Sequence, residues 1–248
     1  MQRSVWIGLV LANLASPALF AKPWKSGEIL SNQTFKYGAF EVRMKASRGD
    51  SAITSINLLK DQSWVPGQEW QELDFEVFGK DSAYKYQSQL ITPGDPRVQH
   101  LKIHDSGQPL NEEFHIYRIE WAPDYLAFYF DGQMVRKETD RKEYGKFLDR
   151  GRVEPMNLRL SLWSGFSDWS GHLNPQALPT PTVIDWVRTF EYKEDSGRFE
   201  KLWEDSFDSF DSQRWSKADW TFEYAENDFT PGNVYTEGGY LNIYFSGQ

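Results

Sequence analysis

Short runs in which apolar and polar residues alternate recur along this chain of 248 residues, and almost no stretch shows helical spacing. Alternation with a period of two places every second side chain on one face of a β-strand. Such runs cover residues 40–45, 73–78 and 115–121, and Asp131-Gly132 after another apolar run is a hairpin signal. Many short strands without helices between them predict an all-β sandwich or barrel, with one short helix near 140–147.

A polar stretch at residues 194–201 (EDSGRFEK) is the one candidate for a linker. The segment that follows it contains strand-like runs but is too short to bury a good core by itself. We therefore predict a single β-sandwich domain over residues 22–248, with the C-terminal strands belonging to the main sandwich.

The N-terminus has the pattern of a targeting segment. Arg3 precedes a mostly apolar stretch, small and helix-breaking residues follow at 16–18, and Ala21 stands before Lys22. This order is typical of a secretory signal peptide over residues 1–21, with an uncleaved anchor as the alternative. The apolar stretch is too short to span a membrane. We expect a secreted or periplasmic protein, with no membrane partner.

Composition excludes several classes of function. The formal net charge is −9 and no basic run is present, so nucleic acid is not expected as a partner. The absence of cysteine excludes disulfides, thiolate metal sites and a cysteine nucleophile. Aromatic residues make up 16% of the chain, and their flat faces suit both a β-sandwich core and the stacking of sugar rings.

Three carboxylates alternate along the run at 72–76. In a strand Glu72, Asp74 and Glu76 project from one face, while Leu73 and the other apolar residues between them project into a core. Adjacent acids repel one another, so this pattern is expected where the charges have a function. A solvated strand face or a calcium site is the alternative interpretation of the acids alone.

The chemistry that this arrangement suits is glycoside hydrolysis. Retaining enzymes use two carboxyls about 5–5.5 Å apart, one as nucleophile and one as general acid/base. The Cα atoms of Glu72 and Glu76 are about 13 Å apart in a strand, a gap that two long side chains can close. Asp74 between them is placed to hold the pKa values of the two glutamates apart.

The segment WQELDFEVFGKD at 70–81 resembles the signature of the family-sixteen glycoside hydrolases. Its uninterrupted Glu-x-Asp-x-Glu spacing resembles the branch of lichenases and xyloglucan transferases. The resemblance implies a jelly-roll, concanavalin A-like β-sandwich and a retaining mechanism. It assigns the nucleophile to Glu72, an assisting role to Asp74 and the acid/base to Glu76.

Other segments extend the resemblance over nearly the whole mature chain and imply substrate-binding residues. Ser26-Gly27-Glu28 followed by 37–45 is similar to a lichenase strand whose Glu and Arg hold sugars. Two positions depart from lichenases: their Asn-Leu-Trp motif is Ser161-Leu162-Trp163 here, and their sugar-binding Asn on the strand after the catalytic one is Gln89 here. These departures weaken the assignment of the glycosidic linkage that is cut. The candidate substrate-binding residues are Glu41, Arg43, Trp70, Gln87, Gln89, Ser161, Trp163 and Asn227.

The order of the segments departs from that of an ordinary family member. Residues 202–215 and 220–227 resemble segments that open other members of the family, but here they come last. The chain therefore resembles a circularly permuted lichenase, and permutation requires original termini that lie close together. We expect Lys22 and Gln248 to be near each other.

The resemblance implies a secreted, endo-acting, retaining β-glucanase whose leading substrate is mixed-linkage β-1,3-1,4-glucan. One alternative is a hydrolase or transglycosylase acting on a bacterial exopolysaccharide, and a second is a non-catalytic glycan-binding sandwich. No cofactor is expected for catalysis, although Asp185 is a candidate ligand of a structural calcium ion as in related enzymes. The expected partner is a polysaccharide, and we expect a monomer.

Overall fold

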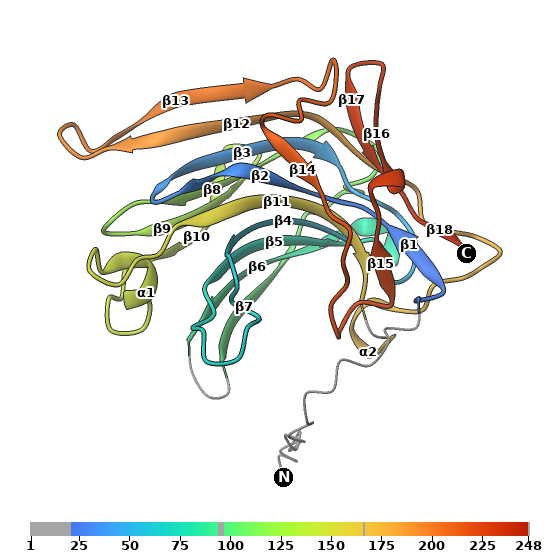
Figure 1. Ribbon diagram of the computed structural model, residues 1–248, viewed down its shortest axis with the longest axis horizontal. Coiled ribbons are helices and arrows are strands. Elements are labelled where there is room, and N and C mark those ends of the chain that lie inside the picture. The colour runs from blue at the N-terminus through green and yellow to red at the C-terminus, as the bar shows by residue number, and fades with distance from the viewer. Residues whose placement is uncertain (1–20, 94–96, 166, 248) are drawn as a thin grey trace, which may run out of the picture.

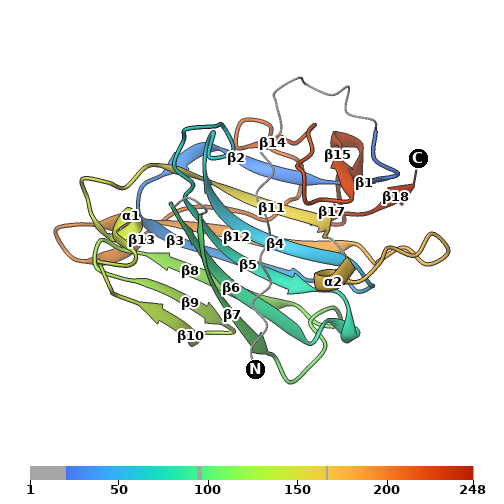
Figure 2. The same ribbon diagram turned by 90° about the horizontal axis from the view of Figure 1, so that it is seen from below.

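Two large β-sheets packed face to face make up most of the protein, and Figures 1 and 2 show them from two directions. The computed structural model describes residues 21–93, 97–165 and 167–247. The expected all-β sandwich is confirmed. Most of the predicted signal peptide, residues 1–20, lies outside the described residues. Among the described residues, no helix is both long and apolar enough to cross a membrane.

One sheet, which we call the front sheet, carries the strand with the three acids. Its strands lie in the order β14 (Trp215–Lys217), β2 (Glu28–Phe35), β11 (Met156–Ser164), β4 (Ala52–Lys60), β5 (Glu72–Phe78), β6 (Lys85–Thr92) and β7 (Val98–Asp105). Neighbouring strands from β2 to β7 are all antiparallel. The acidic strand β5 therefore lies inside the sheet, with a paired strand on each side.

The other large sheet, the back sheet, is built from β10 (Gln133–Glu138), β9 (Leu126–Phe130), β8 (His115–Trp121), β3 (Gly38–Lys45), β12 (Thr182–Lys193), β17 (Tyr240–Ile243) and β16 (Val234–Glu237), with β13 (Arg198–Asp205) beside β12. A small third sheet contains β15 (Asn227–Phe229), β1 (Trp24–Ser26) and β18 (Ser246–Gly247). The short helical turns are η1 (Asp81–Ala83), α1 (Gly145–Leu148), α2 (Ser167–Ser170) and η2 (Pro231–Asn233).

The core lies between the two large sheets. Leu73, Phe75 and Val77 of β5 are each 0% exposed, because the alternation of the strand turns them toward the back sheet. The Phe75 ring meets Tyr117 of β8 and Phe128 of β9 edge-on, with ring centroids 5.5 and 5.2 Å apart. The same alternation turns the carboxylates of β5 to the opposite face, which we call the outer face of the front sheet.

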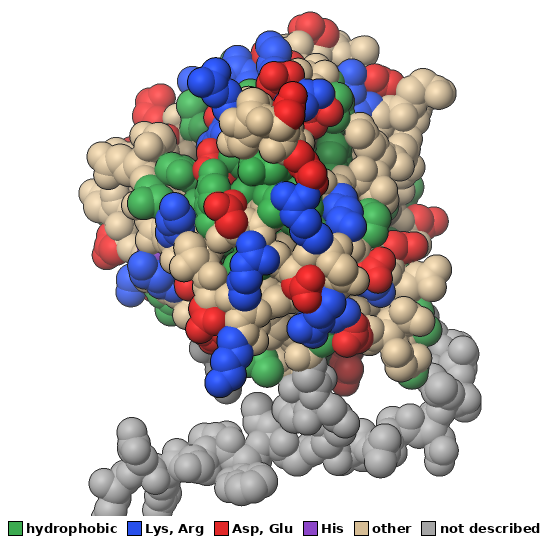
Figure 3. Space-filling view, turned by 90° about the vertical axis from the view of Figure 1, so that its left-hand side faces the viewer, with side chains coloured by type: hydrophobic (Ala, Val, Ile, Leu, Met, Phe, Trp, Pro, Cys, Tyr) green, Lys and Arg blue, Asp and Glu red, His purple; other side chains and the backbone are tan. Residues whose placement is uncertain are grey.

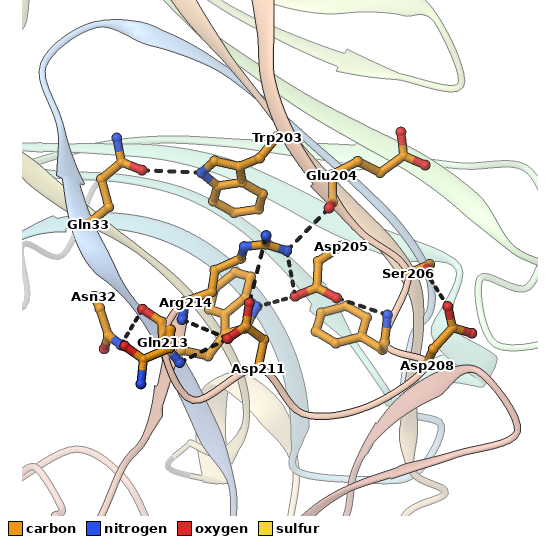
Figure 4. Close-up of polar contacts among 12 residues, drawn as sticks. Asn32, Gln33, Trp203, Glu204, Asp205, Ser206, Asp208, Asp211, Gln213 and Arg214 are labelled. Carbon is orange, nitrogen blue, oxygen red and sulfur yellow. Dashed lines mark hydrogen bonds and ion pairs between the residues drawn. The ribbon is translucent and has the colours of Figure 1, made fainter.

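The C-terminal segment contributes strands to both large sheets. Figure 4 shows how its β13 and the turn before β14 are joined to β2. Asp205 accepts from the indole N–H of Trp215 at 2.8 Å and pairs with Arg214 at 3.1 Å. Trp203 donates its indole N–H to Gln33 of β2 at 3.2 Å. These contacts tie residues after the predicted linker to the N-terminal part of the sandwich.

The two ends of the described chain meet in the small sheet. Trp24 of β1 pairs with Gly247 of β18. Gln248 itself lies outside the described residues, but its neighbour is thus in register with the start of the fold. Figure 3 shows the end of the molecule that carries the turn between β12 and β13, where acidic and basic side chains are interspersed. Glu194, in that turn, forms an ion pair with Arg150.

Replacing Phe75 by alanine tests the packing between the sheets. We expect the free energy of unfolding to fall by about 3–5 kcal/mol, because the substitution leaves a cavity among three aromatic rings. Urea titration followed by far-UV circular dichroism measures the change. The control is Met134→Ala on β10, where the side chain is 55% exposed and the expected change is within about 0.5 kcal/mol. Similar losses for the two variants would contradict this description of the core.

Candidate active site

The three carboxylates of β5 lie side by side on the outer face of the front sheet. Asp74 is 3% and Glu76 7% exposed, while Glu72 is half-buried. β5 pairs with β4 on one side and β6 on the other, so Asp74 and Glu76 have polar neighbours across the strands, whereas Glu72 lies between Leu59 and Ile91. Asp74 lies between Asn57 and Gln89, and Glu76 lies between Ser55 and Gln87.

Both carboxylate oxygens of Glu72 accept hydrogen bonds. The Asn57 amide donates to Oε1 at 3.0 Å, and the indole N–H of Trp70 donates to Oε2 at 2.7 Å. Two donors fix the plane of the carboxylate and stabilise negative charge on it. This environment suits a nucleophile, because an attacking carboxylate must be ionised and correctly oriented.

Glu76 is in the opposite electrostatic situation. Burial raises its pKa to about 8, and the nearby charge of Glu72 adds to that rise. The Gln87 amide donates to its Oε2 and partly opposes the shift. At neutral pH Glu76 therefore holds a proton that it can give to a leaving oxygen, as a general acid requires.

Asp74 lies between the two glutamates and is almost fully buried. Its pKa is raised well above the ordinary value, first by burial and then by the charges of Glu72 and Glu76. A neutral Asp74 places no second negative charge between the glutamates. The site can therefore contain one ionised and one protonated glutamate on the same strand face, the combination that double displacement needs.

Several buried polar atoms on this face have no hydrogen-bond partner among the described residues. They are Asn57 Oδ1, Asp74 Oδ1, Gln87 Oε1 and Arg159 Nε. Buried polar groups in native proteins are nearly always paired, so such atoms call for a ligand or water. A surface with several free donors and acceptors next to two glutamates is suited to the hydroxyl groups of a sugar.

Several predicted substrate-binding residues lie on the outer face near the acids. Gln87 and Gln89 of β6 pair with Glu76 and Asp74, and Ser161 of β11 pairs with Ser55 of β4. Gln87 also contacts the proposed acid/base directly. These three positions therefore lie within one or two strands of the carboxylates of β5.

Trp70 and Trp163, two of the candidate substrate-binding residues, are less open than the stacking of a sugar ring requires. The guanidinium of Arg97 covers the Trp70 ring, 4.0 Å from its centroid. Trp163 is 9% exposed, packs against Trp169 and Phe222, and donates its indole N–H to Ser55 at 2.8 Å. The Trp163 indole thus supports the site from within, whereas Arg97 covers the half-buried Trp70 ring.

Asn227 is also enclosed. It is 0% exposed on β15, and its Oδ1 accepts from the backbone N–H of Ser164 at 2.8 Å. The Asn227 Nδ2 atom has no partner among the described residues. The side chain therefore anchors β15 to the end of β11 beside the outer face.

Glu41 and Arg43 contradict the expectation that they bind sugars beside the acids. Both lie on β3 in the back sheet, and their side chains point away from the core. Glu41 pairs with Arg118 at 2.7 Å, and Arg43 pairs with Asp185. The prediction was wrong because it transferred the roles by the resemblance of a segment, and the sheet to which a strand belongs depends on pairing with strands distant in sequence.

Asp185 does not have the surroundings of a calcium ligand. Its carboxylate pairs with the guanidinium of Arg43, and a cation cannot replace the oxygen donors that calcium needs. Among the described residues, no group of three or more His, Asp or Glu side chains is gathered as a metal site. The side chains around Asp185 therefore do not fit the expected ion, and no step of the chemistry involves it.

An ion pair on the outer face was missed as part of the site. Glu28 of β2 accepts from Arg159 of β11 at 3.0 Å, and the two side chains are 5% and 3% exposed. Burial raises the pKa of Glu28 to about 7, although Arg159 opposes the shift. Ser26-Gly27-Glu28 belongs to the segment that resembles a lichenase, but that resemblance assigned the binding role to Glu41 and Arg43 on the next strand.

Comparisons with known proteins agree with this geometry. Residues 9–188 match the model of the glycosyl hydrolases family 16. A β-glucanase of Fibrobacter succinogenes is 33% identical over 232 residues, which are 89% of this chain and 63% of that protein, so the chain spans less than two thirds of its length. A β-glucanase of Bacillus subtilis is 30% identical over 184 residues, which are 73% of this chain and 69% of that protein.

Solved structures give the same result for the fold. A β-glucanase of Bacillus licheniformis superposes with a TM-score of 0.55 at 27% identity, over 67% of this chain and 71% of that one. A β-1,3-1,4-glucanase (lichenase) derived from a mouse hindgut metagenome gives a TM-score of 0.53 at 25% identity, over 67% and 78%. With its three carboxylates on one strand of the front sheet, the chain belongs to family 16 of the glycosyl hydrolases.

Proposed function

We propose that this protein is a retaining β-glucanase that hydrolyses mixed-linkage β-1,3-1,4-glucan. The observation that carries the proposal is the contrast between two glutamates on one strand face. Glu72 accepts two N–H donors, whereas Glu76 is buried with a pKa of about 8. One carboxylate is thus prepared to attack while the other keeps its proton.

In the first step a Glu72 oxygen attacks the anomeric carbon and forms an ester bond to the sugar. The bond between that carbon and the glycosidic oxygen breaks, and Glu76 gives its proton to the leaving oxygen. In the second step Glu76, now ionised, takes a proton from water, and the resulting hydroxide displaces Glu72 from the anomeric carbon. Two displacements at one carbon retain its configuration, and both glutamates return to their starting protonation states.

The neighbours of the glutamates have separate positioning roles in this cycle. Asn57 and Trp70 hold the Glu72 carboxylate on both oxygens, so that its lone pairs point in a fixed direction. Gln87 orients Glu76 through its amide. The raised pKa of Asp74 favours its neutral form, which limits the electrostatic repulsion between Asp74 and the attacking Glu72.

The names of the relatives support the choice of substrate. The Fibrobacter and Bacillus proteins are named β-glucanases, and one similar structure is named a β-1,3-1,4-glucanase. Ser161 and Gln89 differ from the asparagines expected in lichenases, a departure that weakens the assignment of the linkage, and a bacterial exopolysaccharide is the second candidate substrate. Transfer to a sugar acceptor in place of water is the corresponding alternative reaction.

We also propose that the chain is circularly permuted and exported. The family model ends at residue 188, and the β-glucanase of Bacillus subtilis aligns with 73% of this chain, yet residues 198–247 form strands in both sheets. In a permuted chain the present termini arise from a cut in a continuous segment, so they should lie close together. The pairing of Trp24 with Gly247 fits this requirement. The leader-like sequence of residues 1–21 supports export.

The experiment that tests the proposed function uses the purified protein on four glucans: mixed-linkage β-glucan, laminarin, cellulose and xyloglucan. We expect cleavage of the mixed-linkage glucan, with products whose new reducing end is first the β-anomer by proton NMR. An initial α-anomer would contradict the retaining mechanism. If none of the four glucans is cleaved by the folded protein, the assignment of a plant-type β-glucan is wrong.

Glu72→Gln removes the attacking oxygen while keeping the shape of the side chain. We expect kcat to fall by at least about 10³-fold, because no covalent intermediate forms. Reducing-end assays on mixed-linkage glucan give the rate, and thermal unfolding shows whether the variant is folded. Full activity in a folded Glu72→Gln protein would refute its role. Glucan binding by a wild type that cleaves nothing would favour the non-catalytic sandwich.

The pH dependence of the rate reports the proton on Glu76. Because its pKa is raised to about 8, the acid form is present below that pH and is lost above it. We expect kcat/KM, whose pH dependence reports the free enzyme, to decline as the pH rises through about 8. Glu76→Gln should lose this alkaline limb along with most of its activity on natural glucan. An unchanged alkaline limb in that variant would assign it to another group.

A further inference from the structure

The outer face of the front sheet is open at one end and covered at the other. On the edge strand β7, Leu101 and Ile103 are 48% and 58% exposed. On β11, by contrast, all nine residues from Met156 to Ser164 are buried, although every second side chain points to the outer face. Something other than the back sheet therefore covers this face over β11 and β2.

Two loops that project from the outer face supply the cover (Figure 1). One, residues 61–71, connects β4 to β5, and the other, residues 218–226, connects β14 to β15. Trp64 of the first loop stacks on Trp220 of the second, with ring centroids 5.9 Å apart and an angle of 21° between the planes. The two indoles thus join loops that belong to distant parts of the sequence.

The buried ion pair lies directly beneath this contact. The Arg159 guanidinium is 5.6 Å from the ring centroids of both Trp64 and Trp220. The Arg159 and Glu28 side chains are only 3% and 5% exposed, although an uncovered sheet face would leave such charged groups in water. The two indoles are therefore a lid over the floor made by β11 and β2.

The loop that carries Trp64 has internal bonds that hold it in place. Ser63 donates its hydroxyl to the Lys60 carbonyl at 2.8 Å, and the Val65 and Gln68 N–H groups donate to carbonyls within the loop at 2.9 and 3.0 Å. Trp64 itself remains 49% exposed, so one side of its indole faces water. Its position follows from a structured loop and a specific ring contact.

A glucan chain in this site must run across the strands. Glu72 and Glu76 flank the bond that is cut, and they are arranged along β5, so the sugar chain crosses their line. From β5 it extends over β6 and β7 on one side and toward β4, β11 and β2 on the other. On the second side it meets the joined indoles of Trp64 and Trp220 within two strands of the catalytic acids.

We propose that Trp64 determines where along a glucan chain the enzyme cuts. By stacking on Trp220, Trp64 closes one end of the glucan-binding face, so that the enzyme cuts a few sugars from a chain end. This inference rests on the proposed β-glucanase function and differs from the endo action expected from the sequence. An extended polysaccharide passes through an open cleft in both directions, whereas a blocked end admits only the terminus of a chain.

The test compares the wild type with Trp64→Ala and with Val65→Ala. Val65 is a matched control because it lies in the same loop, is 38% exposed and has no ring to stack on Trp220. The measurement is the loss of viscosity of mixed-linkage glucan plotted against the number of reducing ends released. Cuts near chain ends release ends with little loss of viscosity. Thermal unfolding checks that the variants fold.

For the wild type and Val65→Ala we expect a small loss of viscosity per bond cut, and products of narrow size by mass spectrometry. Trp64→Ala should show a severalfold larger loss per bond and a broader range of products. The same curve for the wild type and Trp64→Ala would overturn the inference while leaving the β-glucanase proposal intact. Absence of cleavage by the wild type would instead overturn the proposed function and the inference together.

Discussion

Mutual repulsion among three carboxyl groups on one strand face is the constraint on which the site depends. β5 can hold them there because its other face is fixed by Leu73, Phe75 and Val77, which are fully buried against the back sheet. Shifting β5 by one residue would place the acids in the core and these apolar side chains outside, so the hydrophobic pattern fixes the register. The core thus keeps the acids together despite their repulsion.

That repulsion is relieved by unequal surroundings. Glu72 is half-buried and accepts two N–H donors, whereas burial raises the pKa of both Asp74 and Glu76. The two strands that flank β5 each supply one donor, Asn57 of β4 to Glu72 and Gln87 of β6 to Glu76. Burial of Glu76 outweighs the opposing hydrogen bond from Gln87 and distinguishes this side chain from the chemically identical Glu72 on the same strand face.

Much of this arrangement could be predicted from the sequence, since alternation is a local property of a strand. The all-β fold and the common face of Glu72, Asp74 and Glu76 follow from spacing alone. The positions of Glu41 and Arg43 could not be predicted in this way, because the sheet that receives β3 depends on contacts with β8 and β12, distant in sequence. Arg97 on Trp70 and Arg159 beneath two indoles are likewise products of tertiary packing.

The central claim is that Glu72 forms a covalent bond to the sugar while Glu76 manages the proton. Its most direct test is to trap the intermediate with a 2-deoxy-2-fluoro β-glucosyl or oligoglucosyl fluoride, which slows release of the glycosyl group. Peptide mass spectrometry then locates the adduct. The account predicts one glycosyl group, attached to Glu72. An adduct on another residue, or hydrolysis of glucan by a protein in which Glu72 stays unlabelled, would contradict it.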